Sequence, residues 1–91
     1  MHIAHNCTIG EEVVMAAGAM VAGSTTIDDR CVLAGQVGIA GHLKIPADCR
    51  FAGDTVVLKN LDESGDYMGH PVMPKRKYLR LMRELRKLGD A

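Results

Sequence analysis

Aromatic side chains are scarce in this sequence. Phe51, Tyr67 and Tyr78 are the three aromatic residues among 91, and there is no tryptophan. Aromatic rings supply much of the buried area in an ordinary mixed core. We therefore expect one small domain whose core is built mainly from aliphatic side chains.

Long apolar runs and paired cysteines are also missing. No stretch is long and apolar enough to span a bilayer, and no signal peptide is visible. Cys7, Cys31 and Cys49 are odd in number and include no closely spaced pair. This argues against a disulfide framework and favours reduced thiols in a cytoplasmic protein. The sequence also shows no metal-ligand cluster and no nucleophilic Ser or Cys triad.

The formal net charge is zero, so bulk attraction to nucleic acid is not indicated. The charge is nevertheless unevenly distributed. Residues 1–62 carry four basic and seven acidic side chains, whereas residues 63–91 carry seven basic and four acidic ones. The chain is therefore a mildly acidic body followed by a basic tail.

A six-residue repeat organises the first two-thirds of the chain. Read from Ile3, residues 3–62 divide into ten blocks: IAHNCT, IGEEVV, MAAGAM, VAGSTT, IDDRCV, LAGQVG, IAGHLK, IPADCR, FAGDTV and VLKNLD. The first position is always Ile, Met, Val, Leu or Phe, the second is mostly Ala or Gly, and the fifth is mostly small or β-branched. This pattern is a hexapeptide repeat.

Three sixes make an eighteen-residue triangular coil with short parallel strands on three faces. Coils stack at about 4.8 Å, the spacing of hydrogen-bonded strands. We predict that residues 1–62 form about three such coils, with first-position side chains inside and fifth-position residues packed beside them. All three cysteines occupy fifth positions, so we interpret them as small buried hydrophobes.

After Asp62 the repeat is lost. Residues 63–73 form a connector with Gly and Pro punctuation, and residues 74–91 are predicted to form a basic amphipathic helix. The predicted apolar stripe of this helix is Tyr78, Leu81, Met82, Leu85 and Leu88. Such a stripe fits packing against a neighbouring helix or subunit, and the basic face is a candidate docking surface.

The eighteen-residue period brings chemistry-bearing residues to one corner. Adding eighteen repeatedly to positions 5 and 6 gives two neighbouring columns: His5, Gly23, Gly41 and Lys59, and Asn6, Ser24, His42 and Asn60. A neutral histidine can accept a proton from an attacking amine or hydroxyl, and a glycine N–H can donate to an oxyanion. The corner is therefore a candidate for acyl transfer. The alternative is that the glycines serve backbone conformation and the histidines face solvent.

Three stretches, IAHNCTIG, MVAGSTTI and AGQVGIAGHLKI, resemble the catalytic coils of UDP-3-O-acylglucosamine N-acyltransferases. These lipid A enzymes use acyl carrier protein as donor, and the resemblance covers most of the chain. It implies a mainly β fold, a left-handed parallel β-helix followed by a C-terminal α-helix. The winding hand comes from the resemblance, because ordinary crossover connections are right-handed.

The resemblance also implies residue roles. His5 would be the general base that deprotonates the glucosamine 2-amine, the Gly23 N–H would form the oxyanion hole, and His42 would orient the reacting groups. Lys59 falls where the family has a basic residue near the phosphopantetheine arm. Further candidates for contacts with the acyl chain or that arm are Asn6, Ser24 and Val56. His2 and His70 have no matching role, and His2 is interpreted as structural.

The implied reaction is direct transfer of a 3-hydroxyacyl chain, with no tightly bound cofactor and no metal. The implied partners are acyl carrier protein, a UDP-sugar lipid substrate and two further copies in a homotrimer whose site lies between subunits. By position, Thr55, Val56 and Leu58 are candidates to line an acyl groove.

Members of this family have an N-terminal uridine-binding domain and earlier coils, which are not in this sequence. We therefore expect an incomplete chain that, made alone, self-associates and shows no transfer. Two alternatives remain: another hexapeptide acyltransferase, acting on UDP-N-acetylglucosamine or dependent on coenzyme A, and a non-catalytic trimeric β-helix scaffold.

Overall fold

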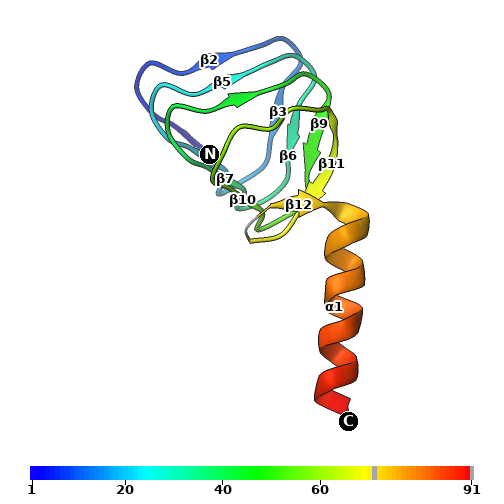
Figure 1. Cartoon of the computed structure of the whole chain (residues 1–91). Coiled ribbons are helices and arrows are strands. Elements are labelled where there is room, and N and C mark those ends of the chain that lie inside the picture. Colours follow the sequence, from blue (N-terminus) through cyan, green and yellow to red (C-terminus); the bar gives the residue numbers. More distant parts are fainter. Residues whose placement is uncertain (71, 91) are drawn as a thin grey trace.

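The computed structural model describes residues 1–70 and 72–90, which form a parallel β-solenoid of about four turns followed by one helix (Figure 1). The elements are β1 (His2–Ile3), β2 (Thr8–Ile9), β3 (Val14–Met15), β4 (Met20–Val21), β5 (Thr26–Ile27), β6 (Val32–Leu33), β7 (Gly38–Ile39), β8 (Lys44–Ile45), β9 (Cys49–Phe51), β10 (Val56–Val57), β11 (Gly65–Met68), β12 (Met73–Pro74) and α1 (Lys75–Asp90). The predicted fold class, a mainly β parallel solenoid with a C-terminal helix, is confirmed.

The strands form three sheets, one on each face of a prism. Their orders are β1-β4-β7-β10, β2-β5-β8, and β3-β6-β9-β11-β12. Within the first sheet, His2 pairs with Met20, Met20 with Gly38, and Gly38 with Val56. Each of these steps is eighteen residues, so the predicted coil length is confirmed through Val57.

The corners use one backbone conformation throughout. The fourth residue of each of the first nine blocks has φ between 58° and 77°, in the left-handed region. Eight of these nine are not glycine: Asn6, Glu12, Ser24, Arg30, Gln36, His42, Asp48 and Asp54. The conformation costs of order 1 kcal/mol per non-glycine residue, and the coil-to-coil hydrogen bonds at each corner offset this cost.

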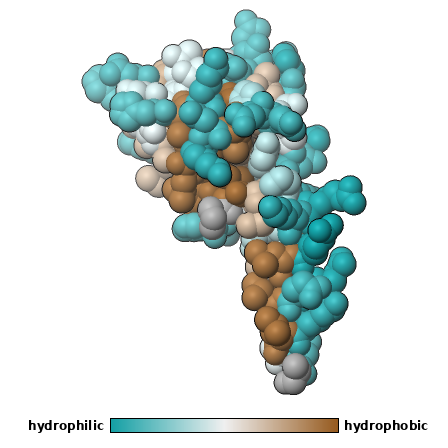
Figure 2. All heavy atoms as spheres, in the orientation of Figure 1, coloured by the Kyte–Doolittle hydropathy of each residue, from teal (hydrophilic) through white to brown (hydrophobic). Residues whose placement is uncertain are grey.

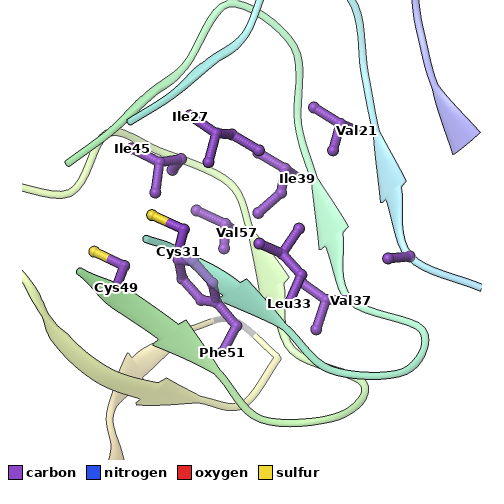
Figure 3. Packing of buried hydrophobic residues seen from close by; sticks show 11 residues of the cluster. Val21, Ile27, Cys31, Leu33, Val37, Ile39, Ile45, Cys49, Phe51 and Val57 are labelled. Carbon is purple, nitrogen blue, oxygen red and sulfur yellow. The ribbon is translucent and has the colours of Figure 1, made fainter. Parts of the chain in front are cut away.

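The core fills the prism axis with the first- and fifth-position side chains (Figure 3). We describe coils nearer the C-terminus as lying above those nearer the N-terminus. Val21, Ile27 and Leu33 of the second coil are 0% exposed, as is Ile45, which lies above Ile27 in the third coil. The cysteines follow the fifth-position rule only in part, because Cys31 and Cys49 are fully buried while Cys7 is half-buried. The fifth-position polar groups donate to the coil above: Thr25 Oγ1 to Ala40 O at 2.8 Å, and Cys31 Sγ to Pro46 O at 3.1 Å.

The segment predicted as the exit connector contains strands. Residues 63–73 contain β11 and the start of β12, and β11 continues the third face in parallel with β9. Its register is shorter by two residues, because Arg50 pairs with Asp66 rather than a residue eighteen positions on. Tyr67 stacks on Phe51 with ring centroids 5.8 Å apart. This segment closes one end of the prism core and extends the third sheet. The solenoid therefore has about four turns, where about three coils were predicted for residues 1–62.

The helix α1 begins after Pro74, one residue later than predicted, and Ala91 lies outside the described residues. It packs mainly on β11 and β12 and has no buried residue. It projects from the solenoid, so the molecule measures 48 × 22 × 20 Å, and its surface is apolar along one side and hydrophilic along the other (Figures 1 and 2). No helix in residues 1–70 and 72–90 has the length and apolar character needed to cross a membrane.

Candidate functional site

The predicted corner exists, and coil-to-coil hydrogen bonds hold it together. The Ser24 N–H donates to the His5 carbonyl at 2.9 Å, and the His42 N–H donates to the Gly23 carbonyl at 3.0 Å. His5, Gly23 and His42 therefore lie on one edge of the prism, in three successive coils. With strands about 4.8 Å apart, His5 and His42 are roughly 10 Å apart along the axis.

Glycine at the corner permits close stacking. A Cβ added at Gly23 would lie 3.3 Å from the His5 carbonyl oxygen, and one added at Gly41 would lie 3.1 Å from the Gly23 carbonyl oxygen. Both distances are tighter than ordinary contacts, so a side chain at either position would require the neighbouring backbone to shift by a few tenths of an ångström. The absence of a side chain at Gly23 also lets a substrate approach its backbone N–H, which the predicted oxyanion contact requires.

The Gly23 N–H is available as a donor. It makes no hydrogen bond within the described part of the chain, because the N–H groups of Ala22 and Ser24 on either side make the coil-to-coil bonds. The Gly41 N–H is in the same situation, so an available N–H belongs to this corner geometry rather than to Gly23 alone. Its position one coil above His5 is what distinguishes Gly23.

Both histidine side chains are exposed at this corner. Across residues 1–70 and 72–90, neither imidazole makes a hydrogen bond or an ion pair. His5 is thus free to meet a substrate. His42 occupies the fourth, left-handed position of its block with φ 60°, so the turn fixes the direction in which its side chain leaves the backbone.

An apolar groove of about 470 Å³ runs across the face formed by β1, β4, β7 and β10, and it reaches the corner at Gly23. Its lining includes small residues, among them Ala22, Gly38 and Ala40, and the larger side chains of Met20 and Leu58. The outward positions of this face recur every eighteen residues, so the repeat itself builds the groove. Its size and apolar lining suit an alkyl chain.

The groove contains some of the predicted residues and lacks others. Val56 and Leu58 line it, but Thr55 does not, because Thr55 is 0% exposed at an inward fifth position. The proposal that Thr55 lines a groove is therefore wrong. Its hydroxyl has no hydrogen-bond partner among the described residues, since the regular coil that would supply a carbonyl above it is not formed.

His2 is a lining residue that the sequence interpretation missed. It was interpreted as structural, yet it lines the groove with Met20, Gly38 and Val56. These four positions are eighteen residues apart, so the arithmetic applied to position 5 would have found them if applied to position 2.

The regular stacking of the two predicted corner columns stops at Gly41 and His42 and does not include Lys59 and Asn60. Asn60 is not in the left-handed conformation, and no hydrogen bond within the described residues joins it to Gly41. Instead its side-chain Oδ1 accepts a 2.8 Å hydrogen bond from the Lys44 N–H. Asn60 thus replaces a backbone carbonyl where the β2-β5-β8 sheet ends, and Lys59 is an exposed residue outside the regular stack.

The buried thiols are unsuited to nucleophilic chemistry. Burial raises the pKa of Cys31, and burial together with the nearby Cys31 raises the pKa of Cys49 to about 11. A thiol must ionise to act as a nucleophile or a metal ligand. In residues 1–70 and 72–90, no group of three or more His, Cys, Asp or Glu side chains is arranged to hold a metal ion.

No protein-family model matches the chain. The chain is, however, 37% identical over 91 positions to UDP-3-O-acylglucosamine N-acyltransferase 2 of Sulfurimonas denitrificans. The match covers 99% of this chain and 29% of that protein. The resemblance to UDP-3-O-acylglucosamine N-acyltransferases is confirmed. This chain spans less than a third of that relative's length.

Proposed function

We propose that the His5 corner carries the acyl-transfer step of a UDP-3-O-acylglucosamine N-acyltransferase in lipid A biosynthesis. The observation that carries this proposal is the stack of His5, Gly23 and His42 on one edge, beside an apolar groove, in a chain related to such an acyltransferase. The reaction moves a 3-hydroxyacyl chain from acyl carrier protein to the 2-amine of UDP-3-O-acylglucosamine.

In this proposal the amine nitrogen attacks the thioester carbonyl carbon while the His5 imidazole takes the proton that the amine loses. The carbonyl oxygen becomes an oxyanion next to the Gly23 N–H, which donates to it. Collapse of the tetrahedral intermediate breaks the carbon–sulfur bond, and the leaving thiolate takes the proton from His5. His42, two coils above His5, orients the reacting groups.

The groove is the proposed site of the acyl chain. Its small lining residues and the side chains of Val56 and Leu58 offer apolar contacts along the face that leads to Gly23. Asn6 and Ser24, exposed beside His5 and Gly23, can hydrogen-bond the phosphopantetheine arm, and Lys59 can meet its phosphate. The arm arrives covalently attached to the donor, so no tightly bound cofactor is part of the proposal.

The proposed donor protein docks on α1. This helix carries seven basic and two acidic side chains, all exposed, which favours an acidic partner such as acyl carrier protein. We further propose a homotrimer in which the groove face of one subunit meets its neighbour, and a cytoplasmic reaction, as the relationship to the acyltransferase implies.

The test replaces the aligned segment of the S. denitrificans enzyme with this chain and assays acyl transfer from 3-hydroxyacyl carrier protein. His5→Ala in this chimera should lower kcat/KM by about 10²–10⁴, the usual contribution of a general base. His70→Ala is the matched control, because His70 is exposed and lies outside the corner and the groove. Added salt should raise the KM for the carrier protein, since exposed charges are screened.

Unchanged turnover of the His5→Ala chimera would remove the general-base assignment. Transfer to a hydroxyl acceptor rather than an amine would assign another hexapeptide acyltransferase. A folded chimera that neither transfers acyl groups nor binds carrier protein would favour the non-catalytic scaffold.

A further inference from the structure

Gly38 differs from the other outward-facing strand residues of the repeat. The residue before each inward first-position side chain belongs to a strand and faces away from the core, because successive strand residues point to opposite sides. Gly38 alone among these residues has no side chain, although glycine weakens a strand through its backbone entropy and packs nothing. The residues that share this place are His2, Thr8, Val14, Met20, Thr26, Val32, Gly38, Lys44, Arg50 and Val56.

Neither usual structural reason for glycine applies at Gly38. Its φ is not in the left-handed region, whereas that of Gly18 is 77°. A Cβ added at Gly38 would have no atom of residues 1–70 and 72–90 within 4 Å, whereas one added at Gly10 would lie 2.7 Å from the Asp29 backbone nitrogen. The remaining reason for glycine inside a strand is that another molecule passes close to the backbone there.

Larger apolar side chains border the space over Gly38. In the register of the first sheet, Met20 lies directly below Gly38 and Val56 directly above it. Ala40, two residues on along the same coil, contributes only a methyl group to the groove, and Leu58 is the next groove residue above it. We call the strip over Gly38 and Ala40, between Met20 below and Val56 and Leu58 above, the Gly38 channel.

The lining of the Gly38 channel suits a hydrocarbon chain. None of its five residues has a polar side chain, so a sugar or phosphate there would lose hydrogen bonds to water without replacement. Met20 and Leu58 are each 58% exposed. An alkyl chain lying between these two side chains would remove part of their surface from water, which favours binding in proportion to the area buried.

The Gly38 channel leads away from the proposed reaction site. Ala40 adjoins Gly41, which stacks above Gly23 at the corner. With about 3.3 Å per strand residue, Gly38 lies about 10 Å from Gly41 along the strand. An acyl chain whose carbonyl carbon is at the Gly23 N–H therefore reaches Gly38 with its distal carbons, and a chain of only a few carbons ends before it.

We propose that Gly38 is a specificity-determining residue, because its lack of a side chain lets the distal part of a long acyl chain cross the third coil between Met20 and Val56. This inference rests on the acyl-transfer function proposed above. A side chain at position 38 would fill the channel and select against long-chain donors. Gly38 acts by leaving space and takes no part in the chemistry at His5.

The test compares the chimera described above with its Gly38→Ala, Gly38→Val and Gly38→Leu variants. The donors are carrier protein bearing a 3-hydroxytetradecanoyl or a 3-hydroxybutanoyl chain. The ratio of kcat/KM for the long donor to that for the short donor should fall as the side chain grows. For Gly38→Leu it should fall at least about tenfold, since one methylene more or less in an apolar pocket already changes kcat/KM by roughly tenfold.

Val32→Leu is the matched control for added volume. Val32 occupies the same outward place on the third sheet and lies outside the groove lining. Its replacement should leave the ratio of the two donors unchanged.

A second measurement does not require turnover. The thiol introduced by Gly38→Cys is alkylated with a maleimide in the absence of acceptor, and mass spectrometry distinguishes modification at position 38 from modification at Cys7. Saturating 3-hydroxytetradecanoyl carrier protein should slow this alkylation at least about fivefold, because the occupied form is unreactive, and the 3-hydroxybutanoyl donor should not.

The two measurements separate failure of this inference from failure of the proposed function. A chimera that transfers neither chain would remove the proposed function, and protection of position 38 by the long donor would still support the Gly38 channel. An unchanged donor ratio in Gly38→Leu, or equal protection by both donors or by neither, would overturn the role of Gly38. Equal loss of both donors with dissociation of the oligomer in analytical ultracentrifugation would assign the space to a neighbouring subunit and would also overturn it.

Discussion

At the scale of single residues, the structure depends on backbone conformation and close approach more than on side-chain volume. Corner residues such as Arg30 and Gln36 adopt a left-handed conformation that glycine would adopt more easily, because stacking fixes it. Conversely, Gly10 has ordinary φ but sits directly beneath the corner at Asp28 and Asp29. Glycine is needed at this position because there is no room for a Cβ.

Gly10→Ala should therefore destabilise the solenoid. A Cβ at this position would lie 2.7 Å from the Asp29 backbone nitrogen and 2.8 Å from the Asp28 carbonyl carbon, so the coils must separate. We expect a loss of about 1–3 kcal/mol in the free energy of unfolding, measured by urea denaturation. Gly38→Ala is the control, because a Cβ there meets nothing within 4 Å and should leave stability unchanged or slightly higher. Equal effects of the two substitutions would contradict the stacking geometry.

At the scale of the structural element, successive coils are joined at their corners by hydrogen bonds and ion pairs between residues eighteen positions apart. Arg30 and Asp48 form an ion pair at one of these corners, and the Arg30 guanidinium holds the pKa of Asp48 below its ordinary value of 3.8. Both side chains are exposed. A carboxylate with a lowered pKa stabilises the fold above its unfolded pKa, and this contribution disappears as pH falls through the folded value.

The Tm difference between the native chain and Asp48→Asn should consequently shrink as the pH is lowered below about 4. At neutral pH the variant lacks the attraction to Arg30, and in acid the native carboxyl is protonated and lacks it too. Asp54→Asn is a matched control, since Asp54 occupies the next corner with the same left-handed φ and has no ion-pair partner among the described residues. A Tm difference for Asp48→Asn that stays constant from pH 7 to pH 2.5, measured by thermal melts, would show that the ion pair does not act on stability.

The elements that follow the repeat were predictable, and those that break it were not. The spacing of first-position residues predicted the coils, the stacking of Gly23 on His5 and the burial of Cys31 and Cys49. It did not predict β11, because a two-residue shortening of the third face is visible only when Asp66 pairs with Arg50. Position Asn60 was assigned to a regular corner, but a side-chain hydrogen bond to Lys44 takes the place of that turn.

At the scale of the whole molecule, one face and one edge of the solenoid carry the proposed chemistry. The groove and the His5 corner adjoin because the same winding that stacks β1, β4, β7 and β10 also stacks their corners. Thr55 was misassigned because alternation within a block decides which side chains face inward, and proximity to Val56 in sequence does not. The spacing of the repeat does not specify the hand of the winding, and trimer formation and substrate binding involve molecules other than this chain.

The central claim is that eighteen residues per coil place Gly23 and Ser24 directly above His5. Scalar coupling across hydrogen bonds, measured by NMR on a chain labelled with ¹⁵N and ¹³C, tests it most directly. The account predicts that the Ser24 nitrogen couples to the His5 carbonyl carbon and that the His42 nitrogen couples to the Gly23 carbonyl carbon. Couplings from these two amides to carbonyls at any other sequence separation would contradict it.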